Sequence, residues 1–296
     1  MEQRLKIAIQ KKGRLFDSSI NLLKKSGLNF GSIKDKLILK CENAPIDILL
    51  LRNNDIADLL MDGVIDLGII GLNELRECEL RRKKEKKPNK FKLLRKLNFG
   101  HCRLSIAIPK DKDFEDTTIL NNSRIATSYP FILEDFALKN NIKINTTYLN
   151  GSVELAPKAK LSDYICDLVS TGMTLEQNDL KEVVEIFSST AALVQSNTSN
   201  QQHELLIEML IPRVNGIIKA SYTKYIMLHA PKNNLNEIIN LLPGKDYPTI
   251  LPHGSDKNKM IIHSVCNEQI FWETMENLRE LGANSILVVP IEKILE

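Results

Sequence analysis

The stretch "PIDILLLRNNDIADLLMDGVIDLGIIG" (residues 45–71) decides the expected fold. Its two apolar runs, Ile46–Leu51 and Ile65–Gly71, are nearly continuous, as is typical of strands covered on both faces of a sheet. The residues between them fit a turn and a short helix. Two neighbouring parallel strands need such a crossover, so we predict a βαβ unit here.

The same alternation continues on both sides of this unit. Residues 5–10 ("LKIAIQ") predict a buried strand, and the helical pattern after it ends near Gly27. A helix is expected at about residues 131–139. Further strands are expected at residues 103–109, 123–128, 142–149, 164–170 and, as a pair, within 183–196. This order predicts an α/β fold.

The C-terminal part has its own order of expected strands and helices. After the polar bridge "SNTSNQQ" (residues 196–202) and a long helix to about Lys219, the order of expected elements is strand, helix, strand, strand, helix, strand. That βαββαβ order is the ferredoxin-like plan, and we assign it to residues 221–296. Such a unit attached to an α/β enzyme is often regulatory, although the fold alone does not establish this.

The composition is that of an ordinary globular protein. The chain has 296 residues, 43% hydrophobic content, five scattered cysteines and a net charge of +3. The N-terminus lacks the long apolar core of a signal peptide, and no run approaches the ~18 apolar residues of a membrane-spanning helix. The cysteines form no C-x-x-C pair. We therefore expect a reduced, cytoplasmic setting and no membrane partner.

One segment is strongly basic. Residues 80–92 read "LRRKKEKKPNKFK". A solvated loop or helix end is the expected structure. A nucleic-acid surface is the alternative, but the run has no interleaved aromatic side chains, so we expect no nucleic-acid partner.

The strongest chemical signal is "CDLVSTGMTLEQNDL" (residues 166–180). An apolar strand places Asp167 at the carboxyl edge of a sheet, where ligands of open α/β sheets bind. The loop then offers hydroxyl groups, a glycine and the start of a helix near Thr174, which together suit a phosphate. The alternative is that Ser170 or Thr171 only caps the helix. The loop has no G-K-[ST] ending and is not a Walker A motif.

Five weaker signals also lie at or near predicted strand ends. Each has a structural alternative, such as surface charge, a glycine turn, a salt bridge or a helix-dipole contact. Together they are what a polyanion-binding cleft between two α/β lobes requires. They are Lys11, Lys12 and Arg14 around Gly13; Gly68 and Gly71; Cys102 and Arg103; Thr127, Ser128 and Tyr129; and Gly151, Ser152 and Glu154.

The five histidines show no H-x-x-x-H or H-E-x-x-H spacing, so no dedicated transition-metal site is expected. A Mg²⁺ ion that arrives with a polyphosphate leaves little trace in a sequence and stays possible.

Ten motifs in this order resemble the ATP phosphoribosyltransferase family, the first enzyme of histidine biosynthesis, in its long form. They span the whole chain and include "IAIQKKGRL", "MDGVIDLGIIG", "LNGSVELAP", "ICDLVSTGMTL", "KYIMLHAP" and "FWETMENLRELGANSILVVPIEKILE". The resemblance implies attack of adenine N1 of ATP on C1 of phosphoribosyl pyrophosphate (PRPP), with Mg²⁺ on the pyrophosphate. It also implies two lobes resembling periplasmic binding proteins, dimers or hexamers, and feedback inhibition by histidine.

The resemblance further implies domain bounds and site residues. Residues 1–97 and 181–220 form the first lobe, and residues 98–180 form the second. Asp167 engages the ribose, and Arg14, Asp167 and Thr174 are catalytic. The implied substrate site comprises Lys11, Gly13, Arg14, Gly71, Tyr129 as an adenine neighbour, Glu154, Asp167, Ser170, Thr171, Gly172, Thr174 and Leu175. The implied histidine site between regulatory domains comprises His229, Thr249 and Ser285.

The chain departs from the family pattern in four places. Met173 replaces a small residue in the phosphate loop, His101 replaces a glycine, and His253 replaces an apolar residue. The basic run is also unusually charged. Two other functions compete with the enzyme: a two-lobed binding protein without catalysis, and a nucleic-acid-binding regulator that uses the basic run.

Overall fold

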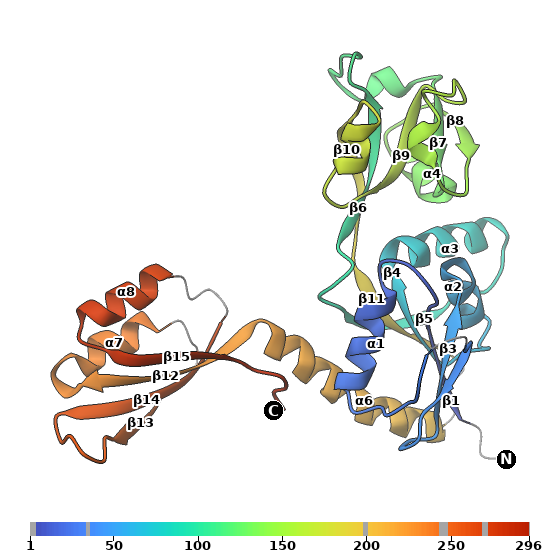
Figure 1. The fold of residues 1–296 in the computed structure, drawn as a ribbon. Coiled ribbons are helices and arrows are strands. Elements are labelled where there is room, and N and C mark those ends of the chain that lie inside the picture. The colour runs from blue at the N-terminus through green and yellow to red at the C-terminus, as the bar shows by residue number, and fades with distance from the viewer. Residues whose placement is uncertain (1–3, 34–35, 198–200, 243–247, 268–271, 296) are drawn as a thin grey trace. The chain divides into compact units, whose positions relative to one another are not determined.

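The computed structural model describes residues 4–33, 36–197, 201–242, 248–267 and 272–295 (Figure 1). The expected bridge at residues 196–202 and the start of the last expected helix lie partly outside these ranges. The chain forms two compact units, residues 1–24 with 28–207 and residues 25–27 with 208–296. No helix in the described ranges is long and apolar enough to cross a membrane.

The first sheet contains the predicted βαβ unit. Its strands lie in the order β2-β3-β1-β4-β11-β5, with β1 parallel to both β3 and β4. Helices α2 and α3 pack on it through Ile56, Leu60 and Leu75. The elements are β1 (Leu5–Gln10), α1 (Phe16–Lys25), β2 (Ile38–Lys40), β3 (Ile46–Leu51), α2 (Asn53–Met61), β4 (Leu67–Gly71), α3 (Leu72–Lys84), β5 (Phe91–Lys96) and β11 (Ala191–Ser196).

The second sheet has the order β10-β6-β9-β7-β8. Helix α4 packs on one apolar cluster through Ile132 and Leu133, while the η2 and α5 segments pack on another through Val153 and Leu175. The elements are β6 (Cys102–Pro109), η1 (Thr117–Leu120), β7 (Arg124–Thr127), α4 (Pro130–Lys139), β8 (Asn145–Tyr148), η2 (Val153–Leu155), β9 (Tyr164–Val169), α5 (Met173–Gln177) and β10 (Leu180–Ser189).

The second sheet extends further along the chain than the expected bound at residue 180. Strand β10 pairs antiparallel with β6 from Leu180 to Ser189, so the chain returns to the first sheet only at Ala191. The reason is that β10 and β11 are consecutive strands in different sheets, a change of partner that apolar patterning does not reveal.

The two segments that connect the sheets are tied together. The Thr190 hydroxyl donates to the carbonyls of Leu97 and Phe99, each at 2.9 Å. Backbone bonds from Leu97 N to Ala191 O at 2.8 Å and from Ala191 N to Phe99 O at 3.0 Å join the same strands. The two crossings therefore form one short hydrogen-bonded ribbon between the lobes.

The third sheet confirms the ferredoxin-like plan. Its order is β13-β14-β12-β15 and every pair is antiparallel. In Figure 1, α7 and α8 lie over one face of this sheet, where Ile226, Leu228 and Ile262 are buried. The elements are α6 (Gln201–Ser221), β12 (Thr223–Pro231), η3 (Lys232–Asn234), α7 (Leu235–Leu241), β13 (Thr249–Pro252), β14 (Lys259–Asn267), α8 (Trp272–Glu280) and β15 (Asn284–Pro290). The predicted fold class, α/β with a C-terminal ferredoxin-like domain, is therefore confirmed.

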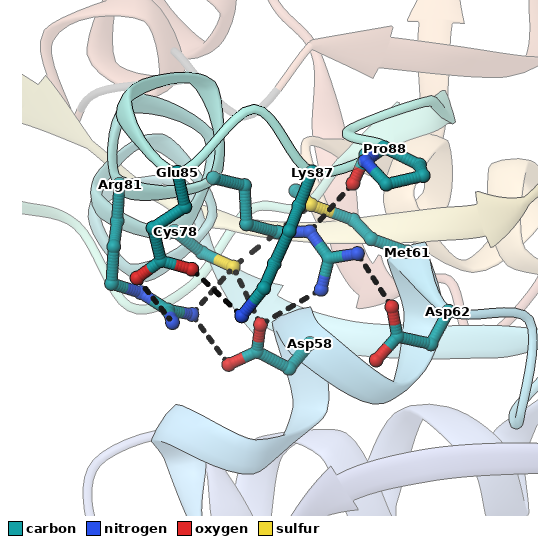
Figure 2. A network of polar contacts seen from close by, with 9 residues as sticks. Asp58, Met61, Asp62, Cys78, Arg81, Glu85, Lys87 and Pro88 are labelled. Atoms are coloured by element: carbon teal, nitrogen blue, oxygen red, sulfur yellow. Dashed lines mark hydrogen bonds and ion pairs between the residues drawn. The ribbon is translucent and has the colours of Figure 1, made fainter.

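The basic run is less solvated than we expected. The Arg82 side chain is only 3% exposed and pairs with Asp58 at 2.9 Å and Asp62 at 2.5 Å. Arg81 also binds Asp58, at 2.6 Å. Figure 2 shows Asp58 of α2 and Asp62, the residue that follows α2, facing the side chains of α3. Two of the cations in the run therefore join α3 to α2 and its C-cap, because the last turns of α3 face these two carboxylates.

The C-terminal segment packs closely on α6. Gly216 accepts a hydrogen bond from the Ile294 amide at 3.2 Å. A Cβ atom at Gly216 would lie 2.1 Å from the Ile294 carbonyl oxygen. Only glycine allows the two backbones to approach this closely.

We predict that Gly216→Ala lowers the stability of the second unit by about 1–3 kcal/mol, because overpacking outweighs the helix propensity gained with alanine. Thermal unfolding of the full chain measures the effect. Gly254→Ala is the matched control, since nothing lies within 4 Å of its added Cβ. Equal unfolding midpoints for the two variants would contradict the close approach.

Candidate active site

Two loops of the first unit meet through one side-chain hydrogen bond. Arg14 lies in the loop between β1 and α1, and Ser170 lies in the loop between β9 and α5. The Arg14 Nη1 atom donates to the Ser170 Oγ at 2.9 Å, across 156 residues of sequence. Both residues are exposed. The remaining guanidinium donors are therefore available to a carboxylate or a phosphate.

The loop after β9 does not serve as a side-chain helix cap. Gly172 occupies the N-cap position of α5 at φ +87°, and no side chain caps the helix. The Thr171 and Gly172 amides donate no hydrogen bond to any described residue, and Met173 and Thr174 begin the helix, where amides have no intrahelical acceptor. Helix α5 has only five residues, so the free amides matter more than a helix dipole.

Asp167 lies next to this loop, at the end of β9. Burial raises the pKa of its carboxyl group, and the nearby Glu154 raises it further. A hydrogen bond from the Leu168 amide at 2.8 Å and the charge of Arg14 partly oppose this shift. The carboxylate thus lies between an acid and a guanidinium, where it can accept hydrogen bonds from hydroxyl groups.

The structure places the other expected residues of this loop in different settings. Thr171 and Thr174 are exposed, whereas Leu175 is buried and anchors α5. The Met173 side chain is 61% exposed, so it does not fill the loop. Asp167, Ser170 and Arg14 therefore form the core of the candidate site, which we call the phosphate cradle together with residues 171–174.

The glycine near Arg14 shapes its loop. Gly13 has φ +110°, and a Cβ there would lie 2.6 Å from the Gln10 amide nitrogen. The Gln10 Oε1 atom accepts the Leu15 amide at 3.3 Å and so holds the turn that presents Arg14. The Lys11 side chain is exposed and forms no hydrogen bond or ion pair with the cradle in the part of the chain that the structure describes.

The two glycines of "GIIG" have different roles. Gly68 packs against Ile56 and Leu60, as a strand glycine under a helix does. Gly71 is the N-cap of α3, and a Cβ there would lie 2.4 Å from the Asn73 Oδ1 atom. Gly71 therefore makes room for Asn73, and its relation to a substrate is indirect.

Asn73 begins a buried network that joins the two sheets. Its Nδ2 atom donates to the Tyr129 hydroxyl at 3.0 Å, and that hydroxyl donates to Glu74 at 2.7 Å. Ser189 donates to Asn73 Oδ1 at 2.8 Å. Burial raises the pKa of Glu74, and the hydrogen bonds from Tyr129 and Asn53 oppose the shift. Burial also raises the pKa of Tyr129, so its hydroxyl stays protonated and donates to Glu74.

A cavity of about 620 Å³ lies beside this network. Its walls come from α2 and α3 on one side and from the Ser128–Tyr129 turn and Asn150–Gly151 on the other. Burial is the largest cause of the raised pKa of Tyr129, and the charges of Glu74 and Asp167 add to it. Tyr129 is the one residue of the expected substrate site that lines the cavity.

Arg103 forms a salt bridge, which was the alternative to a role in binding a polyanion. Its guanidinium pairs with both carboxylate oxygens of Glu182, and Ser105 donates to the same carboxylate at 2.7 Å. Arg103 also donates to the Ser170 carbonyl at 3.3 Å, so it helps to hold the backbone of the cradle in place. Cys102 is half-buried, and burial raises the pKa of its thiol, which does not favour a nucleophile.

The three expected histidine-site residues lie on three strands of the third sheet, His229 on β12, Thr249 on β13 and Ser285 on β15. Ser285 directly follows Asn284, which is the register partner of His229. His229 contacts His253 edge to face, with ring centroids 4.8 Å apart. Thr249 lies two strands away, opposite His263 in β14. Ser285 has φ +51° and lines a separate cavity of about 390 Å³. No hydrogen bond among the described residues joins these three side chains.

Sequence reasoning missed the residues that join α3 to α4. Asn73, Glu74 and Glu77 are spaced i, i+1 and i+4, so they share one face of a helix that starts at a strand end. Acids on the buried side of such a helix could have been noticed. Their partners at the start of α4 could not be predicted, because these partners lie more than 50 residues away in the sequence.

Two family models match the chain. "ATP phosphoribosyltransferase" matches residues 52–216, more than half of the chain, and "HisG, C-terminal domain" matches residues 220–293. The chain belongs to the ATP phosphoribosyltransferase family. Because both models match, it is a long-form member. Members of this family are glycosyltransferases of histidine biosynthesis.

A solved structure agrees with this membership. One chain, described as "ATP phosphoribosyl transferase (HisG:HisZ) complex from Thermotoga maritima", is 28% identical, with a TM-score of 0.58. The match covers 71% of this chain and 98% of that one. The substrate-binding protein of an amino acid ABC transporter is 14% identical over 72% of this chain and 92% of its own, with a TM-score of 0.45.

We predict that Tyr129→Phe destabilises the first unit by about 1–3 kcal/mol at pH 8, because Glu74 loses a donor to its ionised carboxylate. The raised pKa of Glu74 sets the sign of the pH dependence. As the pH falls, Glu74 takes up a proton in both proteins and the difference shrinks. Urea unfolding at pH 8 and at a pH low enough to protonate Glu74 measures this. Tyr148→Phe is the control, since Tyr148 is 57% exposed. A loss that is the same at both pH values would contradict the network.

Proposed function

We propose that the chain transfers the 5-phosphoribosyl group of PRPP to N1 of the adenine of ATP and releases pyrophosphate. The contact between Arg14 and Ser170 carries this proposal, because it joins a guanidinium, a hydroxyl and the free amides of residues 171–174 in one place. These groups suit the 5-phosphate of PRPP. Ser170, Thr171, Gly172 and Thr174 bind that phosphate, and Leu175 anchors the loop.

The other roles follow from charge and position. Asp167 accepts hydrogen bonds from the ribose hydroxyls, and Arg14 and Lys11 offset the charge of the polyphosphates near Gly13. Tyr129 lines the cavity that receives the adenine, and Gly71 and Glu154 border the cleft. Adenine N1 already has a free lone pair, so no general base has to create the nucleophile. Arg14, Asp167 and Thr174 act by positioning the substrates and by stabilising charge on the pyrophosphate that leaves.

Mg²⁺ belongs to this proposal as an ion that arrives with PRPP and neutralises its pyrophosphate. The donor set near the cradle fits such an ion: Glu154 and Asp167 lie close enough for the charge of one to raise the pKa of the other. Carboxylate oxygens are the protein ligands that Mg²⁺ prefers. These two residues would hold the ion on its protein side.

The C-terminal domain is proposed to bind histidine and to inhibit the reaction. Thr249 lies two strands from His229, and no hydrogen bond among the described residues joins His229, Thr249 and Ser285, so the site we propose is completed between the C-terminal domains of two copies. This requires a homo-oligomer, a dimer or a hexamer.

The first test is pyrophosphate release by the purified chain with Mg²⁺, ATP and PRPP. We expect Arg14→Gln and Asp167→Asn each to raise the KM for PRPP by about 10- to 100-fold, which is the worth of a hydrogen bond to a charged group. Lys12→Gln is the control, because Lys12 is exposed in the same loop. A wild-type chain that releases no pyrophosphate would end the enzyme proposal. Unchanged KM values in both variants would end the site assignment.

The second test concerns histidine. We expect millimolar histidine to lower the initial rate of the wild-type chain, and His229→Ala to reduce that inhibition while the rate without histidine is unchanged. Initial-rate measurements over a histidine series decide this. An unchanged wild-type rate across the series would contradict the regulatory role of the C-terminal domain.

A further inference from the structure

The first turn of α4 is capped from another helix. Its N-cap residue, Tyr129, makes no side-chain cap, and Pro130 has no amide proton to offer. The next two amides, of Phe131 and Ile132, donate to the two carboxylate oxygens of Glu77 in α3 at 2.9 Å and 2.8 Å. A carboxylate at this position also complements the helix dipole of the ten-residue helix.

Among the residues that the structure describes, no cation pairs with this carboxylate. Glu74 of its own helix and Glu134 of α4 face Glu77, and the buried thiol of Cys166 lies on the β9 side. Nearby cations are paired elsewhere: Arg76 with Glu79 and Asp135, Arg81 with Asp58 and Glu85, Lys84 with Glu134, and Lys139 with Asp135. In the described ranges, the backbone amides of α4 are the only donors to Glu77. Burial and the neighbouring acids raise the pKa of Glu77 to about 7.

The residues at the start of α4, Ser128 to Phe131, line one wall of the cavity. The Ser128 hydroxyl donates to the Leu149 carbonyl at 2.7 Å and accepts the Gly151 amide at 3.4 Å. The Leu149 amide donates to Thr127 at 3.0 Å. The loop that leads to Glu154 is thus attached to the turn just before α4. A shift of the first turn of α4 would move Ser128, Tyr129 and this loop together.

We propose that Glu77 is a positioning residue whose ionised carboxylate holds the first turn of α4 on α3 and thereby fixes the cavity wall formed by Ser128, Tyr129 and residues 149–151. When Glu77 takes up a proton, one of its oxygens stops accepting an amide, and the wall loosens. The part of this inference that concerns catalysis rests on the proposed function. The contact itself does not.

The contact is tested on the wild-type chain labelled with ¹⁵N-phenylalanine and ¹⁵N-isoleucine. The chain has nine phenylalanines, and Phe131→Leu identifies the Phe131 resonance. We expect the Phe131 and Ile132 amide protons to shift with pH, with an inflection near pH 7. Glu77→Gln removes the inflection. Glu79→Gln, a change in the same helix, retains it. An inflection that is absent from the wild-type chain, or that survives in Glu77→Gln, overturns the proposal.

The catalytic consequence is tested by the pH profile of pyrophosphate release. We expect Glu77→Gln to lower kcat/KM by about tenfold at pH 8, because a displaced cavity wall positions the substrates less well. At pH 6 we expect a much smaller loss, because the wild-type carboxyl group is itself protonated. Glu77→Asp, whose shorter side chain reaches one amide, should fall between the two. A merely structural role would lower activity equally at both pH values, and that result overturns the positioning role.

The two proposals fail in different ways. A wild-type chain that releases no pyrophosphate ends the proposed function, while the amide titration still decides the Glu77 contact. A wild-type chain that releases pyrophosphate, with a Glu77→Gln variant of the same pH profile, ends the positioning role alone.

Discussion

The acids of α3 that face the start of α4 are the interaction on which the first unit depends. Glu77 accepts two backbone amides of α4, and Glu74 accepts the hydroxyl of its N-cap residue, Tyr129. The two sheets are also joined by the ribbon of two crossing strands around Thr190, by the Arg14–Ser170 hydrogen bond and by the Arg76–Asp135 and Lys84–Glu134 ion pairs. A ribbon alone leaves two lobes free to bend. Capping one helix from the other adds a polar attachment at the start of α4, and polar contacts of this kind are specific in geometry.

Because this attachment helps to hold the two lobes in one geometry, the site can act mainly by positioning and needs little side-chain chemistry. The chain belongs to a family of phosphoribosyltransferases, and the reaction we propose needs no base to create its nucleophile. The demands are that two polyanions meet in one orientation and that charge on the leaving group is offset. The contact between Arg14 and Ser170 joins a loop of the first sheet to a loop of the second, so the proposed phosphate site depends on how the two sheets are held together.

The sequence predicted the fold better than the site. Apolar strands such as Ile46–Leu51 and the βαββαβ tail follow from local patterning, and both were found. The loop at residues 170–172 lies between a strand and a helix as predicted, since strand-end glycines and hydroxyl groups are local signals, and its phosphate-binding role stays a prediction. The change of sheet between β10 and β11, the buried Arg82 and the Glu77 cap were not predicted. Each depends on a partner distant in sequence, which periodicity does not encode.

The central claim is that this chain joins ATP and PRPP at the adenine ring. The most direct measurement is mass spectrometry of the products formed by the purified chain with Mg²⁺, ATP and PRPP. We expect one adduct that contains ATP and a phosphoribosyl group, with fragments that retain the ribosyl group on the adenine. Pyrophosphate without an adduct, or an adduct that carries the ribosyl group elsewhere, would contradict it.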